Sequence, residues 1–132
     1  MVAQRTRLQV IQANIANASV LRDSAGNLSP FKRRMVMLAP GAPDARDPSA
    51  RGLGVHVSAI ELDPTPAKPG KYDPDDPDAY KSGPYKGYVA TTNVNTVVEQ
   101  MNALEAGRAY EANVAAAEAT KTMIAQALRL LV

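Results

Sequence analysis

The chain has 132 residues, a formal net charge of +2, no Cys, no Trp and one Phe. This length fits one small domain, and the missing Cys excludes disulfides, thiolate metal sites and Cys nucleophiles. No apolar run approaches the length of about 20 residues that spans a bilayer, so we expect no direct membrane insertion, and nothing resembles a cleavable signal peptide.

Residues 1–19 are predicted to form a first helix of about four or five turns. Leu8, Ile11 and Ile15 are spaced three and four residues apart, which places them on one helical face. Turn-forming residues are then concentrated between Ser19 and Pro30, where they end the helix and begin a loop. The apolar face is therefore expected to pack against another helix.

Nine of the ten prolines lie between Pro40 and Pro84, in the middle of the chain. Phe31–Leu38 and Gly54–Leu62 have the composition of strands, and Tyr85–Ala90 is a candidate third strand. The stretches 40–53 and 63–84 are rich in Pro, Gly and Asp and lack periodicity, so they are predicted to be loops.

Residues 94–132 are predicted to form a second, longer helix. Thr96-Val97-Val98-Glu99 has the form of a capping box, and Asn95 is an alternative cap. No Pro follows, so at about 1.5 Å per residue the helix would reach on the order of 50 Å. An apolar seam of heptad spacing runs along it, with a change of phase near Gly107. The seam consists of Val97, Met101, Leu104, Tyr110, Val114, Ala117, Lys121, Ile124, Leu128 and Leu131.

This seam is longer than the first helix can cover, and the alanines between Ala112 and Ala119 let another helix approach closely. We therefore expect other copies of the chain to cover the remainder. The predicted fold class is α+β, in which terminal helices 1–19 and 94–132 pair as a coiled-coil-like core beside a small β-containing, Pro-rich middle region, 20–93. Lys121 interrupts the seam, either as a snorkelling side chain or as a residue that sets the register.

Three groups of polar residues invite a chemical interpretation, and each has a simpler one. His56 is the only His and has no Ser-centred motif nearby, which favours a surface or packed side chain. The run from Asp73 to Asp78 is interrupted by prolines and lacks the Gly and terminal Glu of an EF-hand loop. Glu105 and Glu111 flank Arg108 at a spacing of three, as ion pairs on a helix surface do. We therefore expect no enzyme activity, no cofactor and no metal.

Two motifs lie at the two ends of the chain. The first comprises Asn14, Ile15, Ala16, Asn17 and Ala18, followed after a loop by Phe31, Lys32, Arg33 and Arg34. The second comprises Gly87 to Ala90, Asn93 to Asn95, Glu99, Met101, Ala106, Arg108, Tyr110, Glu111, Ala112, Asn113, Lys121 and Met123. Together, in this order, they resemble the two signatures of the bacterial flagellar axial proteins, the family of rod and hook subunits. The short chain, the insertion Ser19–Pro30 and Tyr72-Asp73-Pro74 resemble its proximal rod members.

The resemblance implies a structural subunit of the flagellar basal-body rod, the drive shaft that crosses the periplasm. It implies that the terminal helices polymerise into the wall of an export channel, with the β-containing middle outside. The implied partners are other copies of the chain, other rod and basal-body proteins, and the flagellar type III export apparatus, which needs no cleaved signal. It also implies a further stretch of helix before the position of Met1.

The alternative is a small basic nucleic-acid-binding module. Residues 1–34 carry six basic and one acidic residue, a net charge of +5, and Arg5 and Arg7 would join Lys32, Arg33 and Arg34 on such a surface. No aromatic platform interleaves these residues, as stacking on bases would require. We therefore expect no nucleic-acid partner.

Overall fold

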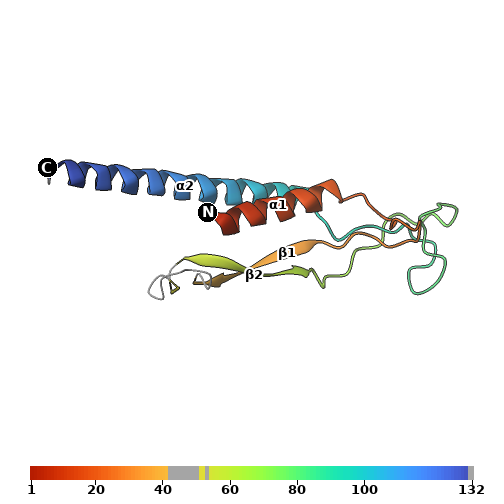
Figure 1. Ribbon diagram of the computed structural model, residues 1–132. Coiled ribbons are helices and arrows are strands. Elements are labelled where there is room, and N and C mark those ends of the chain that lie inside the picture. The colour runs from red at the N-terminus through yellow and green to blue at the C-terminus, as the bar shows by residue number, and fades with distance from the viewer. Residues whose placement is uncertain (42–50, 53, 131–132) are drawn as a thin grey trace.

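The computed structural model describes residues 1–41, 51–52 and 54–130 (Figure 1). Helix α1 (Val2–Ala16), strands β1 (Arg34–Pro40) and β2 (Val55–Leu62), and helix α2 (Thr96–Leu130) follow one another along the chain. Figure 1 shows α2 as a long rod, with α1 along its first part and the strand pair on the other side of α1. The predicted α+β class with packed terminal helices is confirmed. No helix in the described part is long and apolar enough to cross a membrane.

Helix α1 ends three residues before the predicted boundary of Ser19. Asn17 stands at its C-terminus, where its side-chain Nδ2 donates a hydrogen bond to the Ala13 carbonyl at 2.7 Å. The Ala18 amide then donates to the Ile15 carbonyl in a tighter turn. An Asn that bonds its own backbone in this way favours a helix end over a further helical turn.

The two strands pair antiparallel, from Arg34 opposite Leu62 to Pro40 opposite Val55, with an irregularity after Met37. The second predicted strand is confirmed to within one residue. The first begins at Arg34 rather than Phe31, because the Arg33 amide donates to the side chain of Asn93 at 2.6 Å and not to a neighbouring strand.

The predicted third strand, Tyr85–Ala90, is wrong: the segment forms only two isolated bridges, from Tyr88 to Tyr72 and from Val89 to Ala79. Gly87 lies at φ +83° inside a turn, which interrupts the extended conformation. Residues 63–84 are irregular, as predicted for a loop. Most of the other predicted loop, 40–53, lies outside the described residues.

Helix α2 begins at Thr96 and is capped by Asn95, whose Oδ1 accepts hydrogen bonds from the amides of Val97 at 3.1 Å and Val98 at 3.3 Å. The predicted Thr96–Glu99 capping box is wrong, because the Glu99 carboxylate turns inward to other partners. The alternative cap is the one the structure shows. The last two residues of the predicted helix lie outside the described part.

The interior of the described chain contains few large side chains. Its buried hydrophobic residues are four alanines and one isoleucine: Ala3, Ile11, Ala79, Ala90 and Ala106. The largest fully buried side chains are instead polar, Asn14 and Glu99. Hydrophobic burial inside one copy is therefore modest, and polar contacts set how the elements meet.

Candidate assembly surface

A polar junction joins α1, the start of β1, the segment after β2 and the start of α2. We give this name to the cluster of Asn14, Arg33, Asp63, Asn93 and Glu99. Four of its five members were singled out in the two sequence motifs. Asp63 was not, and only its place directly after a predicted strand would have drawn attention to it.

Asn14 and Glu99 form the buried part of the polar junction, each with 1% of its surface exposed. The Asn14 amide group donates to Glu99 Oε2 at 2.9 Å and to the Arg34 carbonyl at 2.8 Å, while its Oδ1 accepts from the Arg34 amide at 2.9 Å. Asn14 therefore fixes both the strand and the second helix against α1. A buried carboxylate without such donors would be strongly destabilising.

Arg33 connects the buried carboxylate to the segment after β2. Its Nε donates to Glu99 Oε1 at 2.8 Å and its Nη1 to Asp63 Oδ2 at 3.1 Å. Burial alone would lower the pKa of Arg33, but the hydrogen bonds and charges of the two carboxylates outweigh it and raise that pKa. Asn93 donates to the carbonyls of Asp63 and Thr65 and so closes the cluster.

Asp63 is held in its charged form by its surroundings. Its pKa lies below the ordinary value, first because the side chain and backbone of Thr65 donate to it and then because Arg33 does. All three effects favour the carboxylate over the neutral acid. The polar junction thus places two carboxyl groups around one guanidinium.

The two helices run antiparallel, because Asn14 late in α1 meets Glu99 early in α2, whereas Arg7 pairs with Glu105 at 3.3 Å. Ile11 is 5% exposed and Ala106 is fully buried between the helices. Other predicted packing residues of this region are half-buried or partly exposed: Leu8, Ile15, Val114 and Tyr110.

The structure divides the predicted seam of α2 between two faces. Val97, Met101 and Leu104, which we call the near stripe, are each at least 63% exposed and lie about half a turn around the helix from Glu99 and Ala106. They face away from α1. The phase change near Gly107, visible in the sequence, is the point at which the seam passes from one face to the other.

Beyond Val114 the second helix has no cover from the described part of the chain: every residue from 115 to 130 is exposed. Ala117, Ile124 and Leu128, which we call the far stripe, continue the face that α1 covers earlier along the helix. Ile124 is 57% exposed and Leu128 is 59% exposed. The last predicted member of the seam, Leu131, lies outside the described residues. An apolar stripe of this length without cover is typical of a surface that meets another molecule.

Some motif residues outside the polar junction form contacts near them in the chain, and others are exposed. Phe31 lies under the guanidinium of Arg34, 5.7 Å from ring centre to carbon. Asn17 and Asn95 cap the two helices. Five further motif residues are exposed on the surface: Ala16, Lys32, Arg108, Glu111 and Asn113.

Three of the polar residues considered as catalytic or metal-binding candidates, His56, Asp78 and Glu105, form contacts within the chain. His56 lies 2.9 Å from the Gly41 carbonyl through Nδ1, at the end of the strand pair. Asp78 pairs with Arg22 at 2.7 Å, and Glu105 pairs with Arg7 rather than with Arg108. No group of three or more His, Asp or Glu side chains in the described ranges is arranged to hold a metal ion.

The chain is similar to known proteins over nearly its whole length. The family described as flagellar basal body rod FlgEFG protein C-terminal matches residues 85–130. Flagellar basal-body rod protein FlgC of Borreliella burgdorferi is 41% identical over 141 residues, which cover 99% of this chain and 90% of the relative. FlgC of Buchnera aphidicola is 35% identical over 130 residues (98% and 89%), and FlgC of Bacillus subtilis is 34% identical over 140 residues (98% and 90%).

Proposed function

This chain belongs to the FlgC family of flagellar basal-body rod proteins, and we propose that it polymerises into the rod through the exposed faces of its terminal helices. Family membership makes it a structural subunit of the rod rather than a member of an enzyme family. The finer proposal is a place in the proximal rod, beside further copies of the chain and other basal-body proteins.

One observation carries the proposal: α2 extends past α1 as a single helix whose far stripe is uncovered. A single helix of this length is marginal in water and gains most of its stability from packing. Fully burying an Ile, Leu or Met side chain contributes about 1.5–3 kcal/mol. Ile124 and Leu128, each more than half exposed, would therefore contribute a few kcal/mol when a neighbouring helix covers them.

The near stripe gives the subunit a second face. Because it points away from α1, a subunit can meet neighbours on two sides of α2 at once. We propose that Leu8, Ile11 and Ile15 attach α1 to α2, while the two stripes, together with Tyr110 and Val114, contact neighbouring subunits. In this arrangement helices 1–19 and 94–132 form an inner wall around an export channel, and residues 20–93 lie outside it.

Export and location follow from the same proposal. The subunit would pass through the flagellar type III export apparatus without a cleaved signal and join a drive shaft across the periplasm. The structure reduces the basic surface on which the nucleic-acid alternative depends. Two of its five residues form ion pairs within the chain: Arg33 with Glu99 and Asp63, and Arg7 with Glu105.

The test is incorporation into purified basal bodies in cells that lack the native gene. Ile124→Asp places a charge on the far stripe, whereas Gln126→Asp places the same charge on the other side of the same turn. We expect Ile124→Asp to abolish incorporation and motility, and Gln126→Asp to leave both near the native level. Equal incorporation of the two variants would refute assembly through the far stripe. Both positions are exposed, so neither change disturbs the fold of the free chain.

A further inference from the structure

A groove with a volume of about 370 Å³ lies at the end of the molecule away from the free end of α2. We call it the Tyr-Pro groove, after residues that line it: Pro30, Pro64, Pro66, Pro69, Tyr80 and Tyr85. No residue of the polar junction except Asp63 and Asn93 reaches it, and neither stripe of α2 does. The groove is therefore a surface separate from the one through which we propose that the helices assemble.

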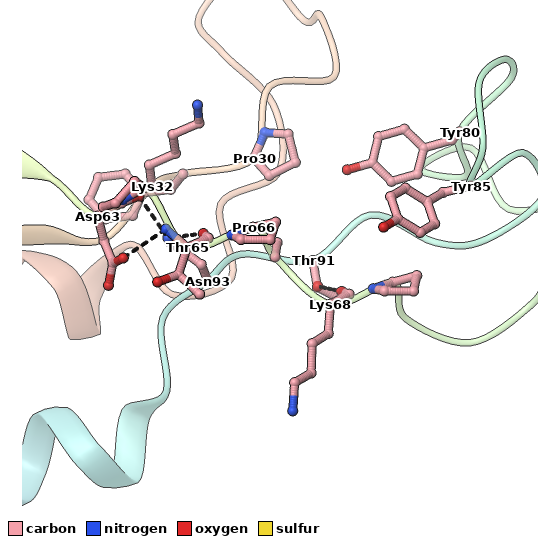
Figure 2. Close-up of a pocket in the computed structure, with 14 residues that line it drawn as sticks. Pro30, Lys32, Asp63, Thr65, Pro66, Lys68, Tyr80, Tyr85, Thr91 and Asn93 are labelled. Carbon is pink, nitrogen blue, oxygen red and sulfur yellow. Dashed lines mark hydrogen bonds between the residues drawn. The ribbon is translucent and has the colours of Figure 1, made fainter.

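The walls of the Tyr-Pro groove suit an extended, proline-containing peptide. The Tyr80 and Tyr85 rings lie 6.4 Å apart, tilted by 45°, and Figure 2 shows both hydroxyls pointing toward Pro30 and Pro66. Aromatic rings that present a flat face and a hydroxyl donor form the usual binding surface for such peptides, because the extended chain leaves its carbonyls free to accept.

The charged side chains around the Tyr-Pro groove favour acidic peptides over basic ones. Lys32 and Lys68 are exposed at its edge and extend to opposite sides of it (Figure 2). The carboxylate of Asp63 is already paired with Arg33 at 3.1 Å. The unpaired charge around the groove is thus positive, which favours an acidic occupant.

The same chain contains a segment with this chemistry. Residues 40–48, Pro-Gly-Ala-Pro-Asp-Ala-Arg-Asp-Pro, carry three prolines, two aspartates and one arginine. The segment follows β1, whose seven residues, at about 3.3 Å each, place Pro40 roughly 20 Å from the start of the strand. Figure 1 shows this end of the strand pair on the opposite side of the molecule from residues 63–92. Because β1 ends at Pro40, away from the groove of its own copy, we consider the groove of a second copy as the partner of this segment.

We propose that the Tyr-Pro groove of one copy binds segment 40–48 of a second copy. The contact deepens the assembly proposed above and rests on it, because both require copies of the chain to lie side by side. It joins two different surfaces, head to tail, so each bound copy still offers a free groove and a free segment. Such a contact extends a chain of subunits unless the rotation between them closes a ring.

A labelled synthetic peptide of residues 39–49 tests the contact without any need for polymerisation. Fluorescence anisotropy would follow its binding to the full chain and to the variants Tyr85→Ala and Tyr85→Phe. We expect saturable binding that Tyr85→Ala weakens at least tenfold, whereas Tyr85→Phe retains the ring and weakens it less. Replacing both aspartates of the peptide by Asn is expected to weaken binding and reduce its dependence on salt.

Two results would overturn the proposal. One is the absence of saturable binding, or binding that Tyr85→Ala leaves unchanged in a variant whose circular dichroism matches the native chain. The other is equal binding of a scrambled peptide of the same composition, which would make the groove a general site for acidic, proline-containing chains. If the peptide does not bind while Ile124→Asp still blocks incorporation into basal bodies, the proposed groove contact is refuted and the proposed assembly through α2 is not.

Discussion

Removal of the Glu99 carboxylate is predicted to be the most damaging single change to the fold of the free chain. Glu99 is 1% exposed and accepts from Asn14 at 2.9 Å and from Arg33 at 2.8 Å. Breaking a buried ion pair by removing one partner costs about 3–5 kcal/mol. In Glu99→Ala, Arg33 keeps its bond to Asp63, so we expect a smaller loss of about 2–3 kcal/mol in the free energy of unfolding.

The assay is urea unfolding followed by far-ultraviolet circular dichroism, which reports the two helices. Glu105→Ala is the matched control, because it removes the same side chain from the same helix. The side chain of Glu105 is 69% exposed and its ion pair with Arg7 is a surface pair, so the expected loss is at most about 1 kcal/mol. The reasoning is refuted if Glu99→Ala costs no more than Glu105→Ala.

A double-mutant cycle between Arg33→Ala and Glu99→Ala isolates the contact from the other effects of each change. We expect the double variant to lose about 1–3 kcal/mol less free energy of unfolding than the sum of the two single losses, because either single change already removes the ion pair. Additive losses would mean that the two side chains act independently, despite the 2.8 Å between them.

Three further predictions concern other parts of the fold. The pKa of Asp63 lies below its ordinary value of 3.8, so the contribution of Asp63 to stability is complete above that pH and is lost as the pH falls through the lower, folded-state value. The free energy of unfolding of Asp63→Asn should therefore depend less on pH below 3.8 than that of the native chain, and an equal dependence would contradict this. Gly87→Ala should destabilise more than Gly83→Ala in urea unfolding, because both glycines have positive φ but only at Gly87 would the new Cβ lie 2.7 Å from a tyrosine ring. Asn95→Ala should cost about 1 kcal/mol in the same assay while Thr96→Ala costs little, since the first removes the cap of α2. A larger loss for Thr96→Ala than for Asn95→Ala would contradict this and favour the Thr96–Glu99 capping box.

The two helices and the second strand could be predicted because their patterns are local. Leu8, Ile11 and Ile15 reveal one face of a helix through spacing alone, and the proline-free stretch after Asn95 reveals a long one. The phase change near Gly107 was equally visible. Its meaning was not, because the sequence does not say which face of α2 meets α1.

The polar junction could not be predicted, because its members are brought together only by the fold. Asn14 and Glu99 are 85 residues apart, and Arg33 and Asn93 are 60 apart. The error at Glu99 shows the reason. Its spacing from Thr96 fits a capping box, but its carboxylate forms stronger contacts with a guanidinium and a buried amide, which leaves the cap to Asn95.

The central claim is that α2 becomes covered only when subunits assemble, and a near-atomic reconstruction of the assembled rod measures this directly. We predict that Ala117, Ile124 and Leu128 are buried there against a helix of a neighbouring subunit. A reconstruction in which these three side chains face the channel or the solvent would contradict the account.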